Sequence, residues 1–425
     1  MAGLAQLDPK MISRPGRFWP DAGSISLGTG PISSPAEVKL VRVSGGSRLM
    51  RLSIMQLSNA RLSSQFGSES MRMLPTVFAV VSFTLVTSLI AAEPTGDSNH
   101  WPRFRGPLGT GQSDATNLPK QLSAESIAWT SDLPVRGHSS PIVWENRIFL
   151  TGAAGTAESL ERRVVCLDRE NGEVLWNEIA ATGGGEQLHK MNSWATPSCA
   201  TDGERVVAFF GEGGLHCFSF DGKPLWSRDL GDFPGSWGVG ASPIIHDELV
   251  IQNCDAEGDS FLLAVDKRSG KDVWRSPRQS KPKGGWSTPI VIDDGGRKEL
   301  VLNGEFGVAS YDPKTGQNLW NCQGFNGRGT PAPVWGNGML YVVNGKSGDV
   351  YSVKPGGEGD VTESRMVWHT PRKGGRDLPS PTLAGNVMVV ISMSGIATGY
   401  DALSGDELWK ARLGGNFSGS PVVAE

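Results

Sequence analysis

Side chains that commonly bind ligands are concentrated in short segments that run into Ser-Pro or Thr-Pro steps. They are Arg136, His138, His189, Asn192, Trp194, Trp237, Trp286, Arg328, Arg376 and Asn416. Guanidinium groups attract anions and indole rings stack on flat or apolar faces, so this mixture suits an anionic, aromatic or carbohydrate ligand. The alternative interpretation is that the Trp side chains pack against one another and the Arg side chains are solvated. The segments are therefore a candidate ligand-binding set with no catalytic role.

Other reactive patterns are absent from the sequence. It contains no HExxH, no nucleophile elbow and no phosphate-cradling Gly motif. The five Cys include no CxxC and no adjacent pair, so we expect small, buried apolar residues. Asp255, Glu257 and Asp259 could bind calcium, but they lack EF-hand spacing, and an acidic hairpin loop is the favoured interpretation. We therefore predict no metal site and no catalytic residue.

Composition and charge restrict the class of protein. The 425 residues include 56 Gly and 27 Pro that are scattered along the chain, which indicates many turns between short strands. The net charge is −4, but residues 1–92 hold nine Lys or Arg against four Asp or Glu, whereas the remainder holds 31 against 40. An acidic body lacks the clustered basic face that a nucleic-acid-binding protein needs. We therefore exclude nucleic acid as a partner.

The first 92 residues differ from the rest of the chain. Residues 71–92 combine a basic start, an apolar stretch and small residues before Glu93, which is typical of a cleaved signal peptide. The alternative is a transmembrane anchor, but the apolar stretch of about seventeen residues is at the low end for a span. We interpret residues 1–70 as a disordered or spurious extension. Cleavage after Ala92 would leave no stable membrane span and an exported protein, periplasmic or extracellular.

Two registers of repeated residues organise the sequence from residue 125 onward. The first is a set of Trp spaced by 41 to 50 residues: Trp129, Trp176, Trp226, Trp274, Trp320, Trp368 and Trp409. The second is a Ser-Pro or Thr-Pro step: Ser140-Pro141, Thr196-Pro197, Ser242-Pro243, Thr288-Pro289, Thr330-Pro331, Ser380-Pro381 and Ser420-Pro421. The two registers interleave throughout, which indicates one array of similar structural units.

Each unit is predicted to contain four short antiparallel strands. A Pro opens the first strand, where an N–H donor is dispensable, and a hairpin signal such as Asn337-Gly338 leads to the second. The third strand ends in Asp, a Gly turn follows, and the fourth contains the spaced Trp, as in Asp266 to Trp274. Four strands every 40–50 residues predict an all-β propeller built of four-stranded blades. The spaced Trp are predicted to dock flat between adjacent blades.

The turn before the Trp carries a family resemblance. The segment Ala264-Val-Asp-Lys-Arg-Ser-Gly270-Lys-Asp-Val-Trp274 resembles the tryptophan-docking repeat of PQQ-like, quinoprotein-type β-propellers, and residues 312–320 and 401–409 repeat it. The opening Trp101-Pro-Arg-Phe-Arg-Gly-Pro107 resembles secreted planctomycete-type members of this group. The resemblance implies seven or eight blades over residues 125–425. Residues 93–124 would be an N-terminal arm that packs on the propeller flank.

The unit count also suggests an incomplete ring. Trp129 lies in a final strand without its own first three strands, and the chain stops six residues into the seventh Ser-Pro unit. We therefore expect a C-terminally truncated propeller.

Three functions are compatible with this pattern. The first is an exported, non-catalytic scaffold that binds an envelope protein or another ligand, as the resemblance to the outer-membrane assembly factor implies. The second is a PQQ- and calcium-dependent dehydrogenase for alcohols or sugars. Such enzymes are longer and carry an adjacent Cys pair, so PQQ and calcium are implied by resemblance alone, and we predict no cofactor. The third is a glycan-binding propeller, which the Trp-rich segments favour.

Overall fold

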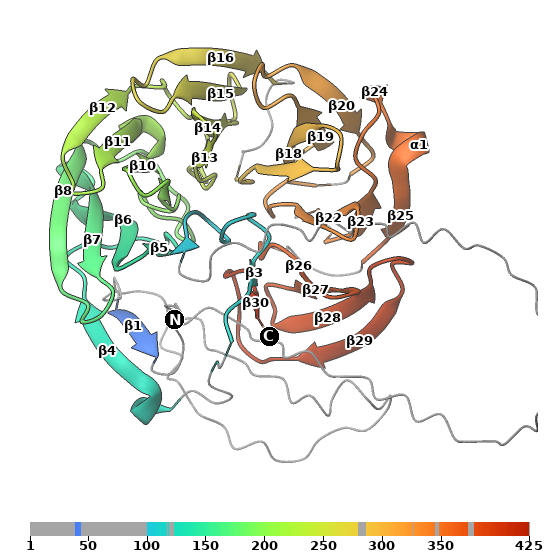
Figure 1. Ribbon diagram of the computed structural model, residues 1–425, viewed down its shortest axis with the longest axis horizontal. Coiled ribbons are helices and arrows are strands. Elements are labelled where there is room, and N and C mark those ends of the chain that lie inside the picture. Colours follow the sequence, from blue (N-terminus) through green and yellow to red (C-terminus); the bar gives the residue numbers. More distant parts are fainter. Residues whose placement is uncertain are drawn as a thin grey trace, which may run out of the picture.

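Six similar sheets surround a common centre in the part of the chain that the structure describes (Figure 1). The computed structural model describes residues 39–43, 100–116, 118, 123–278, 286–325, 327–344, 348–372 and 378–424. The expected signal peptide at 71–92 and most of the expected 1–70 extension lie outside these residues. The architecture is a β-propeller, as the strand pattern predicted, and each sheet is one blade.

The first three blades follow one another along the chain, each in antiparallel order. Blade 1 contains β5 (Ile142–Trp144), β6 (Arg147–Gly155), β7 (Leu160–Asp168) and β8 (Val174–Gly183). Blade 2 contains β9 (Ala200–Thr201), β10 (Arg205–Phe209), β11 (Leu215–Ser219) and β12 (Pro224–Arg228), with the 3-10 helix η3 (Gly211–Gly213). Blade 3 contains β13 (Ile244–His246), β14 (Leu249–Cys254), β15 (Phe261–Asp266) and β16 (Asp272–Pro277).

The next three blades repeat the same order. Blade 4 contains β17 (Ile290–Asp293), β18 (Lys298–Gly304), β19 (Gly307–Tyr311) and β20 (Asn318–Cys322). Blade 5 contains β21 (Val334–Gly336), β22 (Met339–Val343), β23 (Val350–Val353) and β25 (Met366–Thr370). Blade 6 contains β26 (Thr382–Ala384), β27 (Val387–Ile391), β28 (Ile396–Asp401) and β29 (Glu407–Arg412). The long turn of blade 5 adds α1 (Thr362–Arg365) and β24 (Gly359–Asp360), which pairs in parallel with the outer edge of β20.

A seventh position around the centre is built from distant segments. Strand β30 (Val423–Ala424) lies next to β26 and pairs in parallel with β3 (Gln112–Ser113) of the N-terminal arm. Strand β4 (Ile127–Asp132), which follows the 3-10 helix η2 (Ala124–Ser126), pairs with β1 (Lys39–Val43). Trp129 of β4 packs on blade 1, so β4 stands where the outer strand of a preceding blade would lie.

The hydrophobic core lies between blades. One cluster joins Phe209 of blade 2 to Val250 of blade 3, and another joins Ile251 of blade 3 to Leu300 of blade 4. Similar clusters join blades 1 and 2, 4 and 5, and 5 and 6. Each blade therefore buries its faces against its neighbours, as expected for a repeat array whose units cannot form a core alone.

A chain of hydroxyl groups links the first strands of successive blades. At five positions the backbone N–H at the start of the first strand donates to the hydroxyl of the equivalent residue in the next unit, at 2.8 to 3.0 Å. The donor–acceptor pairs are Ser140–Ser198, Ser198–Ser242, Ser242–Thr288, Ala332–Ser380 and Ser380–Ser420. We call these positions the hydroxyl girdle.

The girdle corrects the predicted Ser/Thr-Pro register in two units. In blade 2 the equivalent position is Ser198, followed by Cys199, and not Thr196-Pro197. In blade 5 it is Ala332-Pro333 and not Thr330-Pro331. In both units a Ser/Thr-Pro step occurs two residues too early, and the pairing of first and second strands sets the true register.

Candidate functional site

The loops that lead from the fourth strand of one blade to the first strand of the next lie on one face, which we call the upper face. Four of the ten predicted ligand-binding residues meet there. The His189 ring stacks on the Trp237 ring with centroids 4.0 Å apart, and the Arg328 guanidinium lies 5.3 Å from Trp237 and 5.7 Å from Trp286. Each of these four residues comes from a different inter-blade loop, so the fold gathers side chains separated by up to 139 residues.

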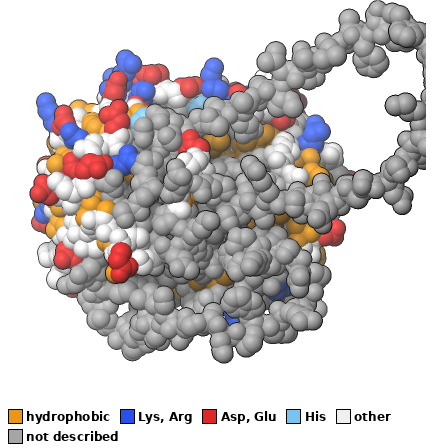
Figure 2. All heavy atoms as spheres, turned by 60° about the horizontal axis from the view of Figure 1, so that its bottom comes forward, with side chains coloured by type: hydrophobic (Ala, Val, Ile, Leu, Met, Phe, Trp, Pro, Cys, Tyr) orange, Lys and Arg blue, Asp and Glu red, His pale blue; other side chains and the backbone are white. Residues whose placement is uncertain are grey.

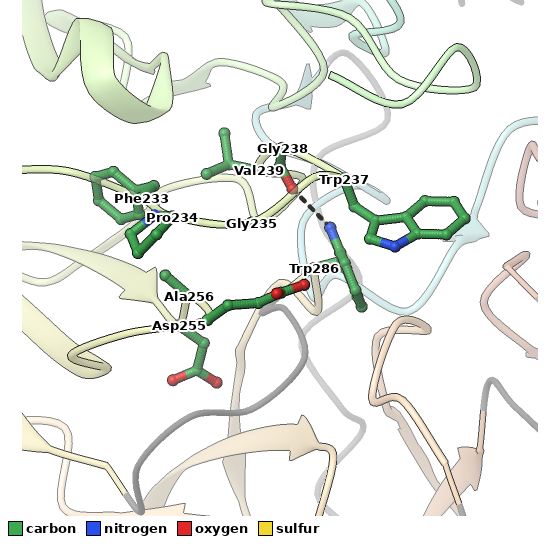
Figure 3. A pocket seen from close by; sticks show the side chains of 10 residues that line it. Phe233, Pro234, Gly235, Trp237, Gly238, Val239, Asp255, Ala256 and Trp286 are labelled. Carbon is green, nitrogen blue, oxygen red and sulfur yellow. Dashed lines mark hydrogen bonds between the residues drawn. The ribbon is translucent and has the colours of Figure 1, made fainter. Parts of the chain in front are cut away.

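Hydrogen bonds to backbone hold this cluster in place. The Asn192 amide donates to the carbonyls of Trp237 at 2.5 Å and Val239 at 3.1 Å. Trp286 Nε1 donates to the Gly238 carbonyl at 2.8 Å (Figure 3). Trp194 Nε1 donates to the Glu186 carbonyl at 2.9 Å. The polar edges of these indole rings are thus used within the protein, and the rings are fixed in orientation.

The other predicted residues lie apart from this cluster or cannot be placed. The Arg136 backbone pairs with Ala153 and its side chain is exposed. His138 is also exposed, and its backbone N–H donates to Ser193 Oγ at 3.2 Å. Asn416 is exposed in the loop before β30. Arg376 lies outside the described residues.

A shallow pocket adjoins Trp237 and Trp286 (Figure 3). Its empty space of about 230 Å³ includes open solvent, and residues 233–235, 238–239 and 255–257 complete its wall. Phe233, Pro234 and Ala256 make part of this wall apolar, and Glu257 adds an exposed carboxylate. Phe233 and Pro234 were not among the predicted residues, although both belong to the same inter-blade loop as Trp237.

A buried ion pair supports the pocket from behind. Arg278 Nε donates to Asp255 Oδ1 at 2.7 Å, and Arg278 Nη1 donates to the Tyr311 hydroxyl at 2.7 Å. Burial raises the pKa of Asp255, and the neighbouring Arg278 opposes that shift. The Asp255 side chain turns away from Trp286 (Figure 3). Asp255 is therefore committed to Arg278, which agrees with the hairpin-loop interpretation of the acidic stretch rather than with calcium binding.

The spaced Trp lie between blades. Five of them donate an indole N–H to a backbone carbonyl of the following blade at 3.0 to 3.3 Å: Trp129 to Arg169, Trp176 to Phe220, Trp226 to Lys267, Trp274 to Pro313 and Trp368 to Ala402. Trp320 instead donates to the buried Glu299 carboxylate of its own blade at 2.6 Å. Trp409 packs beside Gly399 within blade 6.

The sequence belongs with a known group of propellers. A family model described as "Outer membrane protein assembly factor BamB" matches residues 121–234 and 160–353, more than half of the chain. The chain belongs to this family. As the repeat pattern indicated, it is a PQQ-like propeller similar to the outer-membrane assembly factor.

Individual relatives of this BamB-family chain cover only part of it. The outer membrane protein assembly factor BamB of Alkalilimnicola ehrlichii is 31% identical over 182 residues, which are 42% of this chain and 41% of the relative. BamB of Shewanella oneidensis is 25% identical over 296 residues, 66% of this chain and 65% of the relative. A polyvinylalcohol dehydrogenase from a Pseudomonas species is 24% identical over 338 residues, 63% of this chain and 50% of the relative. The chain thus spans 41 to 65% of the length of these relatives.

A solved structure shows the same fold. The crystal structure of BamB from Moraxella catarrhalis superposes with a TM-score of 0.51 at 16% sequence identity, covering 69% of this chain and 80% of that one. No helix in the described part of this BamB-family chain is long and apolar enough to cross a membrane.

The residues present do not fit PQQ held over calcium. Among the described residues, no group of three or more His, Cys, Asp or Glu could hold a metal ion. The five Cys are buried free thiols, as predicted, and burial raises the pKa of Cys166 to about 12. The described residues of this BamB-family propeller thus supply no set of hard-oxygen ligands for calcium. The five Cys include no adjacent pair. We therefore derive no redox step.

The N-terminal arm takes a path that was not predicted. Strand β2 (His100–Trp101) pairs with β5 of blade 1, the Pro102 carbonyl accepts from the Thr201 N–H of blade 2, and Gly109 lies against Ile290 of blade 4. The arm then reaches blade 6, where Thr382 Oγ1 donates to the Thr110 carbonyl at 3.2 Å. The arm crosses the centre of the ring, and the expected packing on the propeller flank is wrong (Figure 1).

Proposed function

We propose that this protein is an exported, non-catalytic β-propeller that binds a protein partner in the cell envelope through the upper-face pocket. Membership of the BamB family supports a protein-interaction scaffold. The candidate site adds Trp237, Trp286 and Arg328 beside an apolar pocket wall. Trp and Arg are the residue types that most often dominate the energy of protein interfaces. The cluster of two Trp and one Arg carries the proposal.

The described site supports two other functions less well, although a polyvinylalcohol dehydrogenase is among the relatives. A dehydrogenase needs a cofactor site that the described donor residues do not provide. A glycan site needs free aromatic faces for sugar stacking. His189 already stacks on Trp237, and Arg328 lies over both Trp237 and Trp286, so these rings are partly covered by neighbouring side chains.

The interaction can be tested by site-specific photo-crosslinking of the full chain in envelope extract. A crosslinking residue at Ser236, which is exposed in the pocket loop, should capture one reproducible protein. The same residue at Lys314, which is exposed in a turn after a third strand, is the matched control and should not capture it. Loss of capture in Trp237→Ala, with an unchanged unfolding midpoint, would place the partner on the pocket. Equal capture from both positions would contradict the proposal.

Catalysis can be tested on the same preparation. The protein incubated with PQQ and Ca²⁺ should show no dye-linked oxidation of alcohols or sugars. Turnover that requires both additions would contradict the non-catalytic part of the proposal.

A further inference from the structure

Two arginines of the N-terminal arm are buried inside the ring. Arg105 is 4% exposed and Arg103 is 8% exposed. Arg105 Nε donates to the Gly109 carbonyl at 3.2 Å, and its Nη2 donates to the carbonyls of Thr110 and Pro381, both at 2.5 Å. Arg103 Nε donates to the Pro107 carbonyl at 3.1 Å. Every described hydrogen-bond acceptor of these two guanidinium groups is therefore a neutral backbone carbonyl.

No carboxylate among the described residues pairs with either arginine. Two other guanidinium groups that are largely buried do have such a partner: Arg162 pairs with Glu186 and Arg278 with Asp255. Burial without a counter-charge lowers the pKa of Arg103 to about 10 and that of Arg105 to about 9. Burying an unpaired charge costs several kcal/mol, so native proteins almost always compensate it.

Arg105 also carries an unused donor. Its Nη1 atom is buried and has no hydrogen-bond partner. The Arg105 backbone has a φ of 65°, a left-handed conformation that is unfavourable for a non-Gly residue. The Gly111 N–H, which donates to the Arg105 carbonyl at 2.9 Å, helps to hold it there. Arg105 is thus held in a strained backbone conformation, and one nitrogen of its buried guanidinium group, Nη1, has no hydrogen-bond acceptor.

We propose that a small oxyanion binds inside the ring at Arg105 Nη1. A guanidinium group presents paired N–H donors that match the oxygens of phosphate, sulfate or a carboxylate. The ligand is a small ion, because the arm itself encloses the two arginines and leaves no exposed surface for a macromolecule. The bound anion neutralises the buried charge and fastens the arm to blade 6. This inference is independent of the partner proposed for the upper face.

The test is a titration of the full chain, purified in a chloride buffer, with phosphate, sulfate or acetate at constant ionic strength. The unfolding midpoint should rise with the logarithm of oxyanion concentration above the dissociation constant, by about 5 °C at 100 times that constant. Equilibrium dialysis with labelled phosphate should show saturable binding. A larger response to phosphate and sulfate identifies a tetrahedral anion, and a larger response to acetate identifies a carboxylate.

Two variants separate this site from general salt effects. Arg105→Met should lose the oxyanion-dependent rise. Arg278→Met removes a buried arginine that already has a carboxylate partner, so it should lower the basal midpoint and keep the rise. If Arg105→Met does not fold, the wild-type titration decides alone. A wild-type midpoint that responds to oxyanions no more than to chloride overturns the proposal.

Discussion

At the residue scale, five of the seven spaced Trp dock against a glycine in the next blade. A Cβ atom added at Gly172, Gly222, Gly270, Gly316 or Gly405 would lie 2.4 to 2.8 Å from an indole ring of the preceding blade. Each of these glycines also has a positive φ. Trp320 faces the lengthened turn of blade 5, which lacks such a glycine contact. Its indole N–H is satisfied instead by Glu299, which also accepts from Ser310 Oγ at 2.8 Å.

The first prediction separates docking from backbone strain. Gly316 and Gly295 have nearly equal φ values of 71° and 74°, but a Cβ at Gly316 would lie 2.4 Å from Trp274, whereas one at Gly295 meets nothing within 4 Å. Gly295→Ala should therefore cost about 1 kcal/mol, from the left-handed backbone alone. Gly316→Ala should cost about 3 kcal/mol, because the Trp274 ring must also move. Urea unfolding of both variants measures the difference, and equal costs would mean that the indole contact contributes nothing.

At the element scale, the hydroxyl girdle separates the features that the sequence predicted correctly from those that it did not. The Trp spacing and turn signals predicted four-stranded blades in the correct chain order because both depend on local chemistry. The predicted start of the first strand was wrong by two residues in blades 2 and 5. In both blades a Thr-Pro step that ends in Pro197 or Pro331 precedes the true position. Only cross-strand pairing distinguishes Ser198 and Ala332 as the true positions, and a single sequence does not contain that information.

The second prediction repairs a gap in the girdle. Ala332 is the one girdle position without a hydroxyl between Ser140 and Ser420 in the described strands, so the Thr288 N–H lacks the acceptor that its counterparts have. Ala332→Ser should stabilise the protein by about 1 kcal/mol by adding one buried hydrogen bond. Ser242→Ala removes the acceptor of the Ser198 N–H and should destabilise it by about 1–3 kcal/mol. The urea unfolding midpoint should therefore rise in Ala332→Ser and fall in Ser242→Ala, relative to the wild-type protein. Ser236→Ala, at an exposed position, is the neutral control.

At the scale of the whole molecule, the arm connects blades 1 and 2, which pack on each other, with blades 4 and 6 farther along the ring. Its contacts with blades 1, 2, 4 and 6 join residues up to 276 positions apart in the chain. Two-residue strands and a Gly-rich turn have no hydrophobic periodicity, so no pattern in the sequence could place the arm across the ring. For the same reason, the sequence did not indicate that Arg103 and Arg105 are buried; beside Trp101 and Phe104, they were compatible with stacking on a partner or packing on the flank. The exposed side chains do not indicate the path of the arm either. Acidic, basic and apolar groups are mixed on the described part of the face in Figure 2.

The third prediction tests whether the arm is an integral part of the ring. The Thr201 N–H donates to the Pro102 carbonyl and the Val423 N–H to the Gly111 carbonyl, so both amides exchange with solvent only when the arm leaves the ring. Native-state hydrogen exchange should show these amides protected about as strongly as the β10–β11 ladder. The Gly295 amide, which donates to Asp293 in an exposed hairpin, should exchange orders of magnitude faster and serves as the internal control. If the arm lay on the flank, the Thr201 amide would exchange at a rate close to that of Gly295, and the central path would be wrong. Protection of Thr201 and Val423 that is lost together would show further that the arm detaches as one unit, since both contacts depend on the same segment between β2 and β3.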